Sequence, residues 1–103
     1  MVRARFIAQV RYGHFSECLK ALEELNAIAR ERRWAEATFW WPAAGAANEL
    51  IAEADYPDLA TFERETEAQG SDAEWMKINR SAAQLIVEGS ARTELLQTPT
   101  PLA

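Results

Sequence analysis

One histidine and one cysteine are the side chains best suited to acid–base or nucleophilic chemistry in this sequence. His14 stands where an alternating segment gives way to a helical one, so its imidazole could act as a general base at a strand end. The alternative is a polar residue at the start of a helix. Cys18 falls among apolar residues of that helix, where a small buried side chain is the commoner role. A lone histidine is not a metal site, because catalytic zinc and iron use three protein ligands. The sequence predicts neither a metal nor an organic cofactor.

Aromatic side chains and one amide form a second group that could line a site. Trp75 and Asn79 are four residues apart, and so lie on one side of a helix. Tyr12 and Trp41 are expected near strand ends on the helix-covered face. Aromatic walls with a few polar tips are typical of a small-molecule pocket, although such residues can also complete a small core. The predicted ligand-binding residues are Tyr12, His14, Trp41, Trp75, Met76 and Asn79. Within this set, His14 and Asn79 are the candidates for catalysis.

The residue pattern predicts the elements that position these side chains. Apolar residues alternate in the expected strands and recur at helical spacing between them. Strands are expected over residues 3–12, 35–42, 48–55 and 91–97. Helices are expected over residues 15–33, from Pro57 to Gly70, and from a capping box at Ser71-Asp72-Ala73-Glu74 to Gly89.

The order β-α-β-β-α-β predicts an α+β fold. Two split βαβ units make a ferredoxin-like sandwich, in which a four-stranded antiparallel sheet carries its helices on one face. Right-handed crossovers put the first and third strands in the centre of the sheet. We expect one domain over residues 1–97 and an extended tail over residues 98–103.

Alternation divides the strand residues between the two faces of the sheet. The helix side is expected to carry Phe6, Val10, Phe39, Trp41 and Leu50. The opposite face is expected to carry the apolar residues Ile7, Trp40, Ile51 and Leu96. An apolar patch of this kind on a small monomer usually marks an interface. We therefore predict a homodimer formed through Ile7, Trp40, Ile51 and Leu96.

Charged residues surround that apolar patch. The carboxylates of Glu49, Glu53 and Asp55 each have an arginine candidate on the first strand, so we expect ion pairs rather than general acids. A solvated face with weak cross-strand pairs is the alternative to an interface. In a dimer, both signs of charge on each subunit would pair across a two-fold axis.

Composition narrows the classes of partner and location. The 103 residues carry a net charge of -5, which argues against a nucleic-acid partner. No continuous apolar run is long enough for a membrane span or a signal peptide. A single cysteine excludes an internal disulfide and suits a reducing compartment. The expected location is the cytoplasm.

Three motifs resemble the dimeric α+β-barrel superfamily, and NIPSNAP-like bacterial proteins in particular. They are the Arg-Tyr-Gly-His-Phe junction at 11–15, the helix start Ala-Asp-Tyr-Pro-Asp-Leu at 54–59 and Glu-Gly-Ser at 88–90. The resemblance extends to about Leu96. It implies two sheets packed face to face, with a cleft between sheet and helices in each subunit.

The resemblance leaves the activity open, because one fold hosts many chemistries. The superfamily includes cofactor-independent monooxygenases, haem-degrading enzymes, isomerase-like proteins, stress-response proteins and ligand sensors. Its oxygenases and haem degraders use an Asn and a Trp in the cleft. Here the order of Trp75 and Asn79 is reversed, and the histidine that haem degraders carry on that helix is missing. We expect a dimeric protein that binds a small apolar or aromatic molecule. The alternative is a cofactor-independent monooxygenase or isomerase acting on an aromatic or polyketide-like compound.

Overall fold

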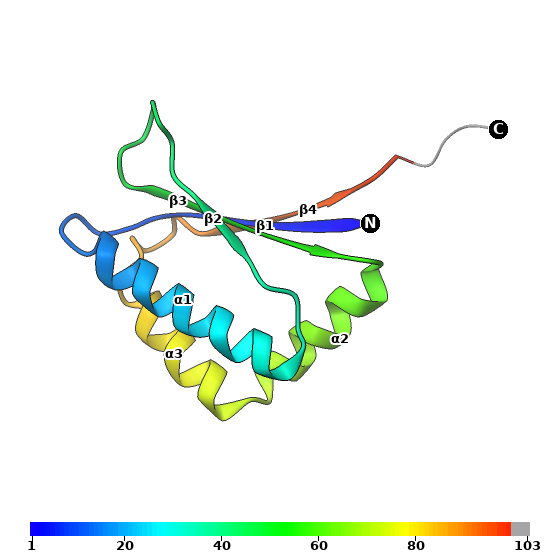
Figure 1. Cartoon of the computed structure of the whole chain (residues 1–103). Coiled ribbons are helices and arrows are strands. Elements are labelled where there is room, and N and C mark those ends of the chain that lie inside the picture. The colour runs from blue at the N-terminus through cyan, green and yellow to red at the C-terminus, as the bar shows by residue number, and fades with distance from the viewer. Residues whose placement is uncertain (100–103) are drawn as a thin grey trace.

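Strands and helices follow one another in the predicted order in the structure, a computed structural model that describes residues 1–99. They are β1 (Val2–Gln9), α1 (Phe15–Arg32), β2 (Thr38–Trp40), β3 (Glu49–Tyr56), α2 (Leu59–Gly70), α3 (Ala73–Ala83) and β4 (Arg92–Gln97). All the helices lie on one side of the sheet (Figure 1). The residues 100–103 of the predicted tail lie outside the described part.

The sheet has the strand order β2-β3-β1-β4. Each neighbouring pair is antiparallel, and β1 pairs with both β3 and β4. The first and third strands are therefore central. The prediction of a ferredoxin-like α+β fold is confirmed.

Two strands are shorter than the alternation of residues predicts. β1 ends at Gln9, and Val10 adds only an isolated bridge to Ile86. β2 covers Thr38–Trp40 instead of residues 35–42, because side chains bind the backbone that precedes it. Asn26 both donates to and accepts from the Ala37 backbone at 2.8 Å, and the Glu65 carboxylate accepts from the Ala35 N–H at 2.7 Å.

The helix boundaries also differ from the sequence prediction. β3 continues through Tyr56, so α2 begins after Asp58, whose carboxylate accepts from the Thr61 N–H, and not at Pro57. α3 is capped by Asp72, one residue later than the predicted capping box. It ends at Ala83, before Gly89. In both helices an aspartate accepts from an N–H three residues on, and aspartate is among the preferred N-cap residues.

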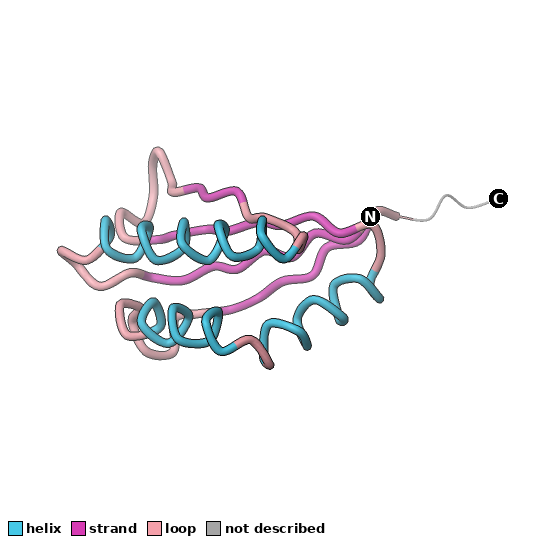
Figure 2. The backbone as a smooth tube through the Cα atoms, turned by 60° about the horizontal axis from the view of Figure 1, so that its bottom comes forward, coloured by secondary structure: helices cyan, strands magenta, loops and turns pink. Residues whose placement is uncertain are grey.

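The core lies between the sheet and the helices, which face the viewer in Figure 2. Leu50, Val10 and Cys18 are its most buried large side chains, with partly buried aromatic and aliphatic residues around them. Leu50 is assigned to this side by the predicted alternation. Among residues 1–99, no helix has the length and apolar character that crossing a membrane would require.

Candidate functional site

A pocket of about 510 Å³ lies between the sheet and the C-terminal part of α3. The floor and walls are mainly apolar. They include Phe6, Leu22, Leu50, Ala82, Ile86 and Val87. Polar groups are contributed by Arg11, Asn79 and Glu88, and Cys18 also lines the pocket. This volume and composition are those of small-molecule sites in proteins, which combine apolar walls with a few polar groups.

The segment after α3 forms one end of this pocket because it pairs with the end of β1. The Val87 N–H donates to the Gln9 carbonyl at 2.8 Å, and the Arg11 N–H donates to the Leu85 carbonyl at 2.8 Å. The Ser90 hydroxyl oxygen accepts from the Gln9 N–H at 3.1 Å. Gly89 has φ +78°, a left-handed conformation that favours glycine, at the turn before β4.

The pocket contains a thiol that stays neutral at physiological pH. Cys18 is 1% exposed, and burial raises the pKa of its thiol. The thiolate is the reactive form of cysteine, so this environment makes Cys18 a poor nucleophile. The predicted role as a small buried side chain fits this position.

Asn79 is the predicted ligand-binding residue that lines the pocket. Tyr12 is 82% exposed in the turn that follows β1, and it is not among the lining residues. His14 is the residue that precedes α1, and its Nδ1 lies 3.2 Å from Glu17 Oε1. His14 does not line the pocket either, so the structure does not bring the two candidates for catalysis together there.

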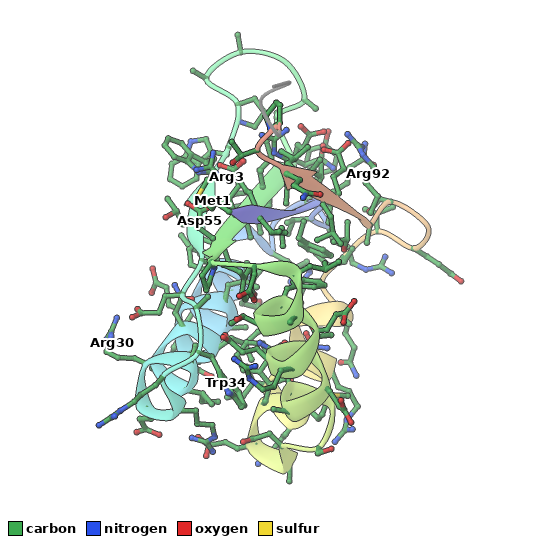
Figure 3. The ribbon with its side chains drawn as sticks, turned by 90° about the vertical axis from the view of Figure 1, so that its right-hand side faces the viewer. Met1, Arg3, Arg30, Trp34, Asp55 and Arg92 are labelled. Carbon is green, nitrogen blue, oxygen red and sulfur yellow. The ribbon has the colours of Figure 1, made fainter. Side chains whose placement is uncertain are left out.

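The predicted tryptophans pack elsewhere. Trp41 lies edge-on to Phe15 at the start of α1, with ring centroids 5.7 Å apart. Trp75 lies edge-on to Trp34, with centroids 5.6 Å apart, and the Arg32 guanidinium lies 5.9 Å from the Trp34 ring. Trp34 is seen within the helical layer in Figure 3. Trp75 is thus directed to the connection between α1 and β2, whereas Asn79 lines the pocket.

Met76 is half-buried on α3 and is not a lining residue of the pocket. The residue pattern does not indicate that Arg11 or residues 84–91 belong to the site, because their position depends on backbone pairing between segments about 75 residues apart. Alternation places Phe6 and Leu50 on the correct face, and it is the signal in the sequence for the pocket floor.

The opposite face of the sheet combines one apolar row with two charged rows. Trp40 pairs with Ile51, and Ile51 pairs with Ile7 across β2, β3 and β1. Trp40 is 54% exposed, whereas Ile7 is 5% exposed. Leu96, the fourth predicted interface residue, is 40% exposed and pairs with Arg3, two rows away.

Ion pairs occupy the charged rows, as predicted for two of the three carboxylates on β3. Arg5 Nε lies 2.8 Å from Glu53 Oε2, and Arg5 also lies 3.6 Å from Glu94. Arg3 Nε lies 2.7 Å from Asp55 Oδ1, and Figure 3 shows this pair beside the sheet. The hydrogen bond from Arg3 lowers the pKa of Asp55. The exposed Arg3–Asp55 pair contributes little to stability, whereas the Arg5–Glu53 pair is partly buried.

Solved structures of known proteins share this architecture. A NIPSNAP domain protein from Burkholderia xenovorans matches 100% of this chain and 98% of its own, with a TM-score of 0.78 and 16% identity. A NIPSNAP family protein from Agrobacterium tumefaciens matches 95% of this chain and 92% of its own, with a TM-score of 0.78 and 18% identity. A mutant of SnoaB, a cofactor-independent oxygenase from Streptomyces nogalater, matches 98% and 95%, with a TM-score of 0.73 and 14% identity.

The chain has the fold of these proteins. The resemblance to NIPSNAP-like members of the dimeric α+β-barrel superfamily is thereby confirmed for the fold. At these identities the likeness does not extend to activity. No protein-family model matches the sequence, and no curated protein matches it. Within residues 1–99, no group of three or more His, Cys, Asp or Glu side chains is placed to hold a metal ion.

Proposed function

We propose that the protein binds a small apolar or aromatic molecule in the pocket between the sheet and α3. The observation that carries this proposal is the pocket itself, about 510 Å³ in volume and walled by apolar side chains. Small-molecule sites have volumes of roughly 300–1,000 Å³. The net charge of -5 also favours such a ligand over a nucleic acid.

A cofactor-independent oxygenase or isomerase is the second candidate function. Asn79 in the pocket favours it, since an amide can hold a polar group of a substrate. The fold shared with a cofactor-independent oxygenase is compatible with it. The ionisable groups lining the pocket are Arg11, Cys18 and Glu88. Neither a guanidinium nor a neutral buried thiol is a good general base, so the Glu88 carboxylate is the group that could take this role in an enzyme. Oxygen uptake on addition of an aromatic compound that binds would favour the enzyme.

A pocket-filling substitution tests the binding proposal. Ala83 lines the pocket and is exposed, so Ala83→Trp should fill the space without disturbing the core. We expect this variant to bind 2-naphthamide at least about tenfold more weakly in calorimetric titration, because the added indole occupies the ligand's volume.

Ala73→Trp is the matched control for that substitution. Ala73 is also exposed on α3 but does not line the pocket, so this variant should bind like the wild type. Equal affinity in all three proteins, or no binding by the wild type, would contradict the proposal.

We also propose that a second copy of the chain covers the open face of the sheet. Trp40 and Leu96 expose apolar surface there, surrounded by both arginines and carboxylates. A surface with both signs of charge can complement itself across a two-fold axis. The loop between β2 and β3 projects beyond the sheet on this side, where it would flank a partner (Figure 1). Light scattering should report twice the 11.6 kDa chain mass, and a monomer at micromolar concentration would contradict the proposal.

The location proposed for this dimer is the cytoplasm. The single cysteine supports it, since secreted domains of this size commonly depend on several disulfides. Fluorescence microscopy of a tagged chain in its host would test this location. Fluorescence at the cell envelope would contradict it.

A further inference from the structure

One arginine of the pocket differs from the other arginines around the sheet in having no carboxylate partner. Arg3, Arg5 and Arg92 each lie within 4.0 Å of a carboxylate oxygen. Arg11 makes no such pair within residues 1–99, although it lies only two residues beyond the end of β1, the strand that carries Arg3 and Arg5. Its Nε donates to the Gln84 carbonyl at 3.1 Å. That bond fixes the guanidinium at the pocket and leaves its terminal N–H groups available.

We propose that the pocket takes an apolar molecule that carries a carboxylate, and that Arg11 binds this carboxylate. The inference deepens the proposed function and rests on it. A guanidinium presents paired N–H donors that match the two oxygens of a carboxylate. The Asn79 amide lines the same pocket and offers a further donor.

The rest of the pocket limits where the charged group can lie. Phe6, Leu22 and Leu50 give the floor apolar character, and a carboxylate against them would lose its hydration without a partner. Glu88 adds one negative charge to the lining, which disfavours an anion with two charges such as a phosphate monoester. A singly charged carboxylate with its apolar part on the floor satisfies both constraints.

Two probes of the same shape separate the carboxylate from the apolar part. We compare 2-naphthoate with 2-naphthamide by calorimetric titration at low ionic strength. The wild type should bind the naphthoate about tenfold more tightly than the naphthamide. A charge-assisted hydrogen bond to an exposed group changes the affinity by about that factor. Raising NaCl to about 0.5 M should remove most of that preference, because the site is open to screening.

Arg11→Gln should abolish the preference for the naphthoate and leave the affinity for the naphthamide unchanged. Arg80→Gln is the matched control. Arg80 lies on α3 and does not line the pocket, and this substitution removes the same charge as Arg11→Gln. It should keep the preference. The unchanged affinity for the amide shows that each variant retains the pocket.

The outcomes distinguish this inference from the proposal on which it rests. If the wild type binds both probes equally, or if Arg11→Gln keeps the preference, the carboxylate assignment is wrong while the pocket remains a binding site. If the wild type binds neither probe, the binding proposal itself fails. Should Arg11→Gln not fold, the salt titration of the wild type decides, and a preference that survives about 0.5 M NaCl would overturn the assignment.

Discussion

The two faces of the sheet are built from neighbouring residues of the same strands, yet they differ in what they can do. Leu50 is 0% exposed under the helices, whereas Ile51, the next residue, lies half-buried on the open face. The covered face derives stability from apolar burial and contains the pocket. The open face carries exposed ion pairs and an exposed tryptophan, which add little to the stability of a monomer. The covered face therefore accounts for folding and contains the proposed ligand site, whereas the open face is the surface on which we propose that a second copy binds.

The largest effect is expected when a charge is placed on the open face, and the same change on the covered face is the control. Trp40→Glu should weaken the dimer by roughly 3–5 kcal/mol, because it would bury an unpaired carboxylate in the interface. Trp41→Glu changes the next residue, which packs on Phe15 on the helix side, and should leave the dimer intact. Light scattering across a concentration series measures both variants. A dimer that survives Trp40→Glu would place the interface elsewhere.

Truncating one leucine on each face tests where the stability resides. Leu50→Ala should lower the free energy of unfolding by about 2–5 kcal/mol, because it leaves a cavity in a packed core. Leu96→Ala should cost about 0.5 kcal/mol or less in a monomer, because that side chain is 40% exposed. Urea unfolding at a concentration where the protein is monomeric gives both values. Similar costs at the two positions would show that the open face is not a solvated surface in the monomer.

Acid should lower the free energy of unfolding through one aspartate in each region, by less than the Leu50→Ala substitution does. The pKa of Asp72 is lowered by the hydrogen bond from the Trp75 N–H and by Arg32, and the pKa of Asp55 is lowered by Arg3. Because both pKa values lie below the value in the unfolded chain, about 3.9, the stabilisation from these carboxylates is fully present above that pH. It is lost as the pH falls through the lowered values.

The two aspartates should contribute unequally to that loss. The Asp72 side chain is 15% exposed and the Asp55 side chain 47% exposed, so solvent screens the Asp55 pair more. Asp72→Asn should therefore flatten the acid dependence of the urea midpoint more than Asp55→Asn. The reverse order would mean that the open-face pair matters more than its exposure indicates.

Much of the fold could be predicted because the two periodicities in the sequence are clear. Alternation in β1 and β3 gives the faces of Phe6, Leu50 and Ile51, and the helical stripes give the side that is covered. Strand order then follows from the handedness of the crossovers. Strand ends could not be predicted in the same way. The start of β2 is set by Asn26, whose amide binds the Ala37 backbone from α1, and helical spacing does not reveal this bond.

The pocket was harder to predict from the sequence than the sheet was. Its end depends on the bond from the Val87 N–H to the Gln9 carbonyl, between segments that carry no shared pattern. The spacing of Trp75 and Asn79 places both on one side of α3, but it does not say which neighbour each side chain meets. Trp75 packs edge-on against Trp34, and Asn79 lines the pocket. Residue type and spacing predict a small-molecule site that includes Asn79, whereas the tertiary contacts decide which other side chains line the pocket.

A titration of ¹⁵N-labelled protein with 2-naphthamide, followed by amide chemical shifts, tests the binding pocket most directly. We expect shifts at Phe6, Leu22, Leu50, Asn79 and Ala83, and an unchanged amide at Trp40. Shifts centred on Trp40 would place the ligand on the open face. The absence of any shift with millimolar probe would contradict the claim that this pocket binds small apolar molecules.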